Sequence, residues 1–273
     1  MAEKLIFDVS SYQGLIDFDK LLSGDKDKPA AMIVRSGISW GYVDKHFVRN
    51  YNGIKSVGLP VTDYHVIRAD APAKQQVNAW LKLMELVKWD GKTSLIPDIE
   101  LHNGKTKQQV TDVFFETCDY MISLGLNIVN YSARWFLDGY MIRHPRYADF
   151  YWMLAAYGLT DENGYREMLT SEFVDPKKKY IPLDIPVKKV VMHQFTDRFM
   201  NSSGKLYGME SEGLDASRWT GTDDEFELVF GKSGTVEEEH PKVVVGNQLS
   251  ELGVMLTNVQ TKLTEVIKGV NDL

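Results

Sequence analysis

The sequence predicts an α/β fold, an irregular (β/α)8-type barrel that resembles a TIM barrel and has reduced helices in its second half. Short apolar runs rich in Val, Ile and Tyr alternate with longer helical patterns over roughly 220 residues. This alternation indicates a parallel sheet, and the number of strand-like runs favours closure into a barrel. A length of 273 residues accommodates one such barrel and a small appendage.

Seven short segments have the length and composition of strands, and many are flanked by Gly, Pro, Asn or Asp. They are Lys4–Val9, Ala31–Arg35, Val61–Val66, Ser94–Ile99, Asn127–Tyr131, Phe150–Ala155 and Val190–Gln194. Four segments between them have helical patterns, namely His46–Val57, Lys74–Val87, Lys107–Gly125 and Ser132–His144. The stretch Leu159–Pro186 is polar, contains prolines and lacks a helical pattern, so we expect the barrel to be irregular there.

The composition divides the chain into a barrel at residues 1–230, a linker at 231–241 and an amphipathic helix at 242–273. In the last part, apolar residues from Leu249 to Leu273 recur at alternating spacings of three and four, the a/d register of a coiled coil. We expect residues 249–273 to form a homo-oligomer, or to attach to a polymer or another partner. The alternative is a helix folded back on its own barrel.

Charge and hydropathy exclude several classes of partner. The net charge is −7 and the pI is about 5.4, which argues against a nucleic-acid partner. We expect no membrane span, because no run of about 18 apolar residues occurs. The first residues lack the basic and apolar regions of a signal peptide, so we expect synthesis in a cytoplasm. Cys118 is the single cysteine and lies in an apolar helical stretch, which predicts a buried, inert thiol.

The segment Leu95–Leu101 places two acidic residues at the end of a predicted strand. Side chains two apart on a strand project to the same face, so Asp98 and Glu100 point together while Ile99 points away. In parallel barrels, active sites are built at the carboxyl ends of the strands. Mutual repulsion and burial raise one pKa there, and one protonated acid beside one carboxylate can break a glycosidic bond.

Further acids and several flat or polar side chains are expected at the same mouth of the barrel. Asp8 closes the first predicted strand, and Asp215 lies in a short segment late in the chain. Sugar sites need flat apolar faces and directional polar groups. The candidates of this kind at predicted strand ends are Tyr64, His65, Tyr131 and Gln194. Taken alone, a histidine such as His65 is more often structural.

At these residues the sequence resembles the glycoside hydrolase family 25 lysozymes, the Chalaropsis-type muramidases common among phage endolysins. The match begins with Phe7–Gly14, which is similar to the opening D-V-S-x-x-Q-G of the family. It extends over roughly residues 4–222 in the order of the family, which makes it specific as a set. The other matching segments are Ile33–Gly37, Asp44 with Phe47 and Asn50, Gly58–Val61, Tyr64-His65, Pro97–Glu100, Asn130–Ser132, His193–Thr196 and Gly213–Asp215.

The resemblance implies hydrolysis of the β-1,4 bond between N-acetylmuramic acid and N-acetylglucosamine in peptidoglycan glycan strands. It implies that Glu100 is the general acid and that Asp98 stabilises charge or orients the substrate. Asp8 and Asp215 match supporting aspartates, while Arg35 and Trp152 lie in matching segments and join the candidate substrate-binding residues. No metal and no other cofactor is expected. Two carboxylates on one strand argue against a protein nucleophile and favour the substrate's N-acetyl group or water.

Three positions depart from the family pattern and leave alternatives open. Val66 stands where the family usually has Phe, Trp152 is displaced by one residue, and His193 replaces the usual Trp. The alternatives are a barrel that binds wall glycan without cutting it and a related hydrolase of chitin or another N-acetylated glycan. For the leading hypothesis we expect a phage or prophage enzyme, made in the host cytoplasm. It would reach the wall through a holin-type hole or on a virion.

Overall fold

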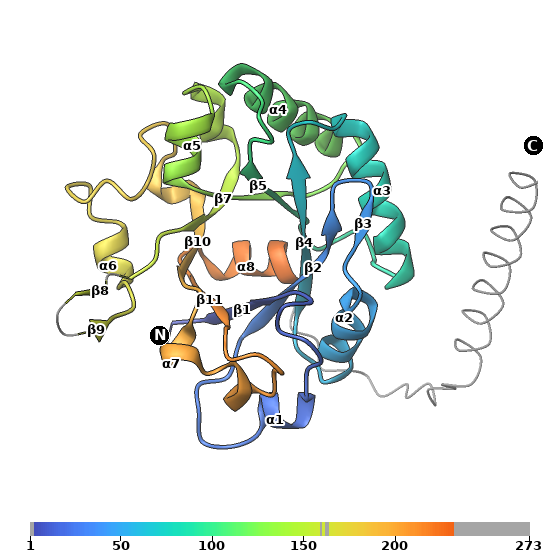
Figure 1. Cartoon of the computed structure of the whole chain (residues 1–273), viewed down its shortest axis with the longest axis vertical. Coiled ribbons are helices and arrows are strands. Elements are labelled where there is room, and N and C mark those ends of the chain that lie inside the picture. The colour runs from blue at the N-terminus through green and yellow to red at the C-terminus, as the bar shows by residue number, and fades with distance from the viewer. Residues whose placement is uncertain (1–2, 159, 162–163, 232–273) are drawn as a thin grey trace, which may run out of the picture. The chain divides into compact units, whose positions relative to one another are not determined.

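The computed structural model describes residues 3–158, 160–161 and 164–231, and in it eight strands close into a barrel (Figure 1). Around the barrel the order is β1-β11-β10-β7-β6-β5-β4-β2, and a parallel β1–β2 pairing closes the ring. The eight strands are β1 (Leu5–Val9), β2 (Ala31–Ile38), β4 (Val61–Arg68), β5 (Ile96–Leu101), β6 (Val129–Ala133), β7 (Tyr151–Ala155), β10 (Val190–Thr196) and β11 (Asp215–Trp219). The predicted barrel and its seven predicted strands are confirmed, with strand ends shifted by a few residues.

The eighth strand, β11, corrects the expectation of a wholly parallel sheet, because it runs antiparallel to both β10 and β1. The connection from β10 to β11 contains only α7 (Phe199–Ser202) and the 3-10 turn η3 (Gly204–Tyr207). A parallel neighbour requires a crossover that returns the chain along the barrel, and this connection has none. The chain therefore enters β11 at the end where β10 finishes, and Asp215 begins its strand at the barrel mouth.

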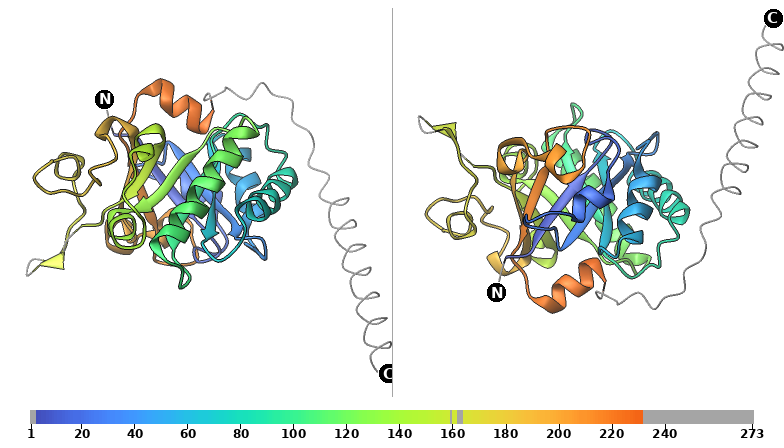
Figure 2. Two further views of the ribbon diagram at one scale, coloured as in Figure 1. Left: turned by 90° about the horizontal axis from the view of Figure 1, so that it is seen from above. Right: turned by 90° about the horizontal axis from the view of Figure 1, so that it is seen from below.

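Helices cover the outside of the barrel, as Figures 1 and 2 show. The four predicted helices are confirmed as α2 (Phe47–Ser56), α3 (Ala73–Leu86), α4 (Lys107–Ser123) and α5 (Arg134–Tyr140), the last ending earlier than expected. A short α1 (Phe18–Leu22) and the helix α8 (Asp223–Phe230) were not anticipated. Cys118 is buried in α4, as predicted, and burial raises the pKa of its thiol.

The second half of the barrel is poor in helices, as expected. After the 3-10 turn η1 (Pro145–Asp149) and β7, the chain forms the small hairpin of β8 (Thr160–Asp161) and β9 (Gly164–Tyr165). Only α6 (Thr170–Phe173) and the 3-10 turn η2 (Val187–Lys189) lie between that hairpin and β10.

An apolar plug fills the amino-terminal end of the barrel. The aromatic side chains of Phe226 and Phe230 on α8 pack with Ile6 and Ile96, which belong to barrel strands. The backbone N–H of Ser94 donates to the carbonyl of Val229, which fixes α8 against the strand ends. Because this end is closed, solvent reaches the barrel interior from the carboxyl-terminal mouth.

The hairpin from β2 to β3 (Tyr42–Val43) stands at that mouth. Its turn contains Ser39 in the left-handed region, with φ 55°, a conformation that costs a non-glycine residue free energy. Two backbone bonds hold the hairpin, since Ser39 N–H donates to the Val66 carbonyl and Asp44 N–H donates to the Ser36 carbonyl. The hairpin is therefore a fixed part of the barrel rim.

Residues 232–273 lie outside the described residues, so the structure does not address the predicted helix at 242–273 or the linker beyond Gly231. Among the described helices, none combines the length and the apolar character needed to cross a membrane.

Packing of the β2–β3 hairpin can be tested at two of its glycines. A Cβ on Gly37 would lie 2.2 Å from the Tyr42 carbonyl oxygen, whereas a Cβ on Gly41 meets no atom within 4 Å. We therefore expect Gly37→Ala to lower the free energy of unfolding by about 2 kcal/mol in urea denaturation. Gly41→Ala is the control and should change it by less than about 0.5 kcal/mol. Equal effects of the two substitutions would contradict this packing.

Candidate active site

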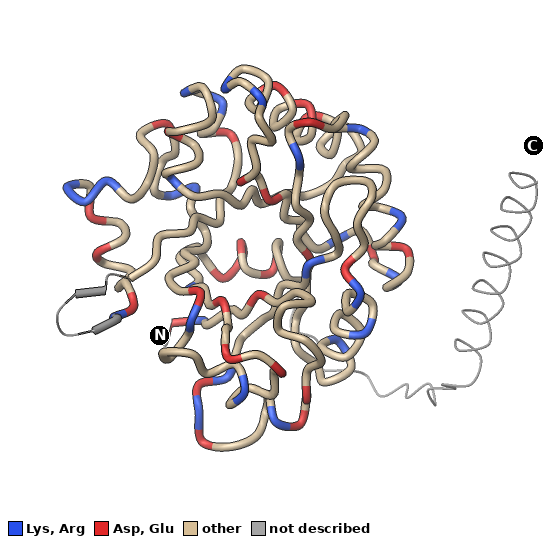
Figure 3. The backbone as a smooth tube through the Cα atoms, in the orientation of Figure 1, with Lys and Arg blue, Asp and Glu red and all other residues tan. Residues whose placement is uncertain are grey.

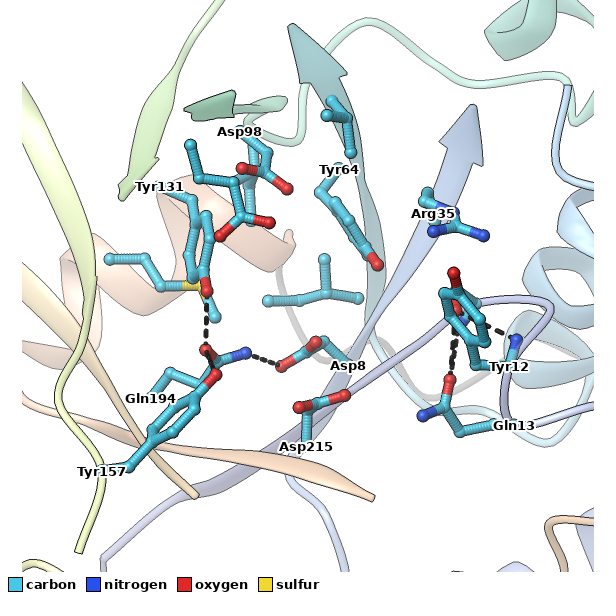
Figure 4. A pocket seen from close by; sticks show the side chains of 16 residues that line it. Asp8, Tyr12, Gln13, Arg35, Tyr64, Asp98, Tyr131, Tyr157, Gln194 and Asp215 are labelled. Atoms are coloured by element: carbon cyan, nitrogen blue, oxygen red, sulfur yellow. Dashed lines mark hydrogen bonds between the residues drawn. The ribbon is translucent and has the colours of Figure 1, made fainter. Parts of the chain in front are cut away.

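A cavity of about 220 Å³ opens at the carboxyl-terminal mouth of the barrel (Figure 4). The four predicted carboxylates, Asp8, Asp98, Glu100 and Asp215, all line it. Four other predicted residues, Arg35, Tyr64, Tyr131 and Gln194, line it as well. Eight residues that are scattered through the sequence thus meet in one cavity, since strand ends converge at the mouth of a barrel.

The inward-facing side chains change from apolar to polar toward the mouth. Ile33, Ile96 and Met153 form an apolar floor that lines the cavity from below. Two residues further along their strands, Arg35 and Asp98 face the same cavity, as the two-residue repeat of a strand requires. Figure 3 shows acidic positions on the strands around the opening, whereas most basic positions lie on the outer helices and loops.

Asp98 and Glu100 face the cavity from β5, as predicted, while Ile99 between them packs into the outer core. Asp98 lies deep and is only 3% exposed, whereas Glu100 lies nearer the rim and is partly exposed. The Oδ1 atom of Asp98 is buried and has no hydrogen-bond partner among the described residues. A buried, unpaired carboxylate oxygen is costly in a folded protein, so this atom is available to a donor that enters the cavity.

Asp8 and Asp215 lie side by side, because their Cα positions are partners in the antiparallel pairing of β1 with β11. Asp8 is buried and accepts a hydrogen bond of 2.9 Å from Nε2 of Gln194. The β10 strand carries Gln194, so the two strands that flank β11 are joined by this bond across the floor of the mouth.

Gln194 is the centre of a polar network. Its Oε1 accepts hydrogen bonds from the hydroxyl groups of Tyr131 at 2.8 Å and Tyr157 at 2.9 Å. Two tyrosine donors at one atom identify that atom as the amide oxygen, so the amide nitrogen faces Asp8. The network fixes both tyrosine rings along one wall of the cavity (Figure 4).

Burial raises the pKa of all four carboxyl groups, and repulsion by neighbouring carboxylates adds to the rise for Asp8, Asp98 and Asp215. Desolvation is the largest cause for Asp8, whose pKa rises to about 6 although its bond from Gln194 opposes the rise. The pKa values of Asp98 and Asp215 rise well above their usual range, through desolvation first and then through neighbouring carboxylates. Desolvation also raises the pKa of Glu100. Carboxyl groups packed in this way hold their protons to a higher pH than free carboxyl groups do.

Arg35 supplies the positive charge in the cavity lining, but it is already paired. Its guanidinium donates to Oδ2 of Asp44 at 3.0 Å and to Oγ of Ser11 at 3.1 Å. It lies over the rings of Tyr12 and Tyr42, at 5.2 and 5.7 Å from their centroids. The arrangement fixes a cation between two aromatic rings at the rim.

His65 and Trp152 were predicted to bind substrate, but both lie outside the cavity. His65 is fully buried behind Tyr64, and its ring stacks on Trp80 at 5.1 Å. Burial lowers the pKa of His65 to about 4, so the ring is neutral at neutral pH. Trp152 is also fully buried and stacks on Phe114 at 5.6 Å. Neighbours on a strand face opposite sides, so inward-facing Tyr64 and Met153 turn these two residues outward.

The structure adds cavity residues that were not among the predicted site residues. Tyr157 follows β7 at its carboxyl end, so the rule that placed the other residues at the mouth could have found it. Tyr12 and Gln13 come from the loop after β1, within the opening motif. Within the described parts of the chain, no group of three or more His, Cys, Asp or Glu residues is arranged to hold a metal ion.

Comparisons with known proteins give a family and a common fold. The model of glycosyl hydrolases family 25 matches residues 7–203. The autolytic lysozyme of Clostridium acetobutylicum is 25% identical over 125 residues, which cover 46% of this chain and 37% of that protein. This chain thus spans little more than a third of the curated relative.

Solved structures at low identity share the fold. The modular autolysin LytC from Streptococcus pneumoniae, solved with a synthetic peptidoglycan ligand, has a TM-score of 0.59 at 20% identity, covering 80% of this chain and 47% of that one. The bacterial lysozyme from Streptomyces coelicolor has a TM-score of 0.60 at 13% identity, covering 86% and 100%. The CTP1L endolysin has a TM-score of 0.60 at 20% identity, covering 84% and 70%.

The family match covers most of the barrel, including the strands that carry Asp8, Asp98, Glu100 and Gln194. On this evidence the chain belongs to glycosyl hydrolases family 25.

Proposed function

We propose that this protein hydrolyses peptidoglycan by cleaving the β-1,4 bond between N-acetylmuramic acid and N-acetylglucosamine. The observation that carries the proposal is the buried cluster of four carboxylates at the barrel mouth, with Asp98 and Glu100 adjacent on β5. Membership of glycosyl hydrolases family 25 supports it, as does the likeness to an autolytic lysozyme.

Glu100 is the general acid in this proposal. It lies nearer the rim than Asp98 and is partly exposed, so it can reach the oxygen that bridges two sugars. Desolvation raises its pKa, which favours the protonated form that can transfer a proton to the leaving oxygen.

Asp98 is the partner that stabilises charge or orients the substrate. Its unpaired Oδ1 is a ready acceptor for a donor such as the N–H of an N-acetyl group. The two carboxylates approach the substrate from one strand, whereas a retaining mechanism with a protein nucleophile needs carboxylates on opposite faces of the bond. We therefore favour attack by the N-acetyl oxygen of the substrate or by a water molecule, with Asp8 and Asp215 in supporting positions.

In this proposal the substrate is bound by Tyr64, Tyr131, Gln194 and Arg35. The tyrosines offer flat faces to sugar rings, and the hydrogen bonds of Gln194 hold Tyr131 in place. Arg35 is held rigidly by Asp44, so its guanidinium edge can meet a carboxylate or hydroxyl group of the substrate at little cost in side-chain entropy.

We further propose a phage or prophage setting, with synthesis in the host cytoplasm and release through a holin-type hole or carriage on a virion. The likeness to the CTP1L endolysin and to an endolysin from bacteriophage P40 supports this setting. Detection of the protein in purified virions would separate the two routes.

Cleavage can be tested with purified peptidoglycan by measuring new reducing ends and identifying them after borohydride reduction. We expect reduced muramic acid from the wild-type protein, and a fall in kcat of about 10²–10⁴-fold for Glu100→Gln. Glu116→Gln makes the same chemical change at an exposed position on α4 and should keep full activity. Binding to peptidoglycan without new reducing ends would point to a binding barrel, and cleavage of chitin alone would point to the other hydrolase class.

Self-association through residues 249–273 remains a proposal that rests on the heptad spacing of the sequence. Deletion of residues 236–273 should lower the molar mass measured by light scattering to that of one chain. Several tethered barrels would act at raised effective concentration on a repeating polymer. An unchanged mass after deletion would contradict self-association and favour another partner or a helix folded back on the barrel.

A further inference from the structure

We propose that the β2–β3 hairpin and the loop after β4 form an outer saccharide subsite with Trp40 as its platform. The subsite takes an N-acetylated sugar of the same glycan strand that occupies the cavity. This inference rests on the proposed function, since it extends the binding of that substrate beyond the sugars at the cleaved bond.

Trp40 is an exposed aromatic residue with no core role. Its side chain is 57% exposed at the tip of the hairpin, although a large apolar side chain usually gains free energy from burial. A surface depression lies against it, and Arg68 and Asp70 also line that depression. The depression therefore combines a flat aromatic face with a pair of polar side chains.

The polar wall has the geometry that sugar hydroxyl groups need. Arg68 donates to both carboxylate oxygens of Asp70, at 2.9 and 2.8 Å, which holds the guanidinium and the carboxylate in one plane. Both groups are partly exposed, so their remaining donors and lone pairs are open to a ligand. A sugar ring stacked on Trp40 would present its hydroxyl and amide groups to this pair.

Hydrogen bonds of the buried His65 side chain hold the turn that carries Trp40. The Ser39 carbonyl lies 2.6 Å from Nε2 of His65, and because a carbonyl only accepts, Nε2 carries the ring proton. Nδ1 then accepts from the Ser36 hydroxyl at 2.9 Å. His65 therefore acts as a positioning residue, which fixes the left-handed turn and holds Trp40 in place at low entropic cost on binding.

The hairpin connects this subsite to the cavity. Tyr42 lies two residues after Trp40, lines the same depression and faces the guanidinium of Arg35 at 5.7 Å. Arg35 in turn lines the cavity that holds the four carboxylates. A glycan strand that leaves the cavity past Arg35 and Tyr42 would meet Trp40 next, in the turn that precedes β3, the strand labelled in Figure 1.

The test compares hydrolysis of peptide-free glycan oligosaccharides of increasing length. We expect Trp40→Ala to lower kcat/KM about fivefold on long oligosaccharides and to leave the shortest cleaved oligosaccharide unaffected. Trp40→Phe should restore most of the loss, because it keeps a flat face. Leu86→Ala removes an equally exposed side chain, also 57% exposed, from the far end of α3 and should change nothing.

A loss that is equal at all lengths, or no loss at any length, would overturn the proposal. So would a loss seen only with peptide-bearing strands, which would assign Trp40 to the peptide instead. Calorimetric binding of the same oligosaccharides to Glu100→Gln and to Glu100→Gln/Trp40→Ala makes the comparison without hydrolysis. Absence of cleavage by the wild-type protein would refute the proposed function. The calorimetric comparison would still show whether Trp40 contributes to binding of long oligosaccharides.

Discussion

The structure depends on one electrostatic constraint, the burial of four carboxyl groups in a single cavity at the barrel mouth. Asp8, Asp98, Glu100 and Asp215 all have raised pKa values, mainly through desolvation. A carboxyl group whose pKa is higher in the folded state stabilises the fold fully below its unfolded pKa. For Asp8 that stabilisation is lost as the pH rises from about 4 through about 6. At neutral pH the cluster therefore destabilises the fold.

The rest of the barrel offsets this constraint. The apolar plug at α8 closes the opposite end and adds to the hydrophobic burial of the two other core clusters. Gln194 gives Asp8 a hydrogen bond, and Arg35 places a positive charge that lowers the pKa of Asp98. Asp44 also binds Arg35, so the cavity keeps a net acidic lining and the carboxyl groups keep their affinity for protons.

The sequence allowed prediction of what depends on strand periodicity and strand ends. The barrel and the facing of Asp98 and Glu100 follow from those two rules, whereas Asp215 meets Asp8 because β11 runs antiparallel to β1. The same periodicity, applied to the neighbours of Tyr64 and Met153, would have excluded His65 and Trp152 from the cavity. The antiparallel course of β11 and the position of Trp40 depend on tertiary contacts, such as the bond from His65 to the Ser39 carbonyl, which no local pattern encodes.

The central claim is that burial raises the pKa of the carboxyl groups in this cluster above their usual values. Titration of the side-chain carboxyl carbons of Asp8 and Glu100 by NMR, in the full chain without substrate, tests it most directly. The account predicts that Asp8 titrates near pH 6 and that Glu100 titrates above its usual value of 4.5. Midpoints at or below the usual values for both groups would contradict it.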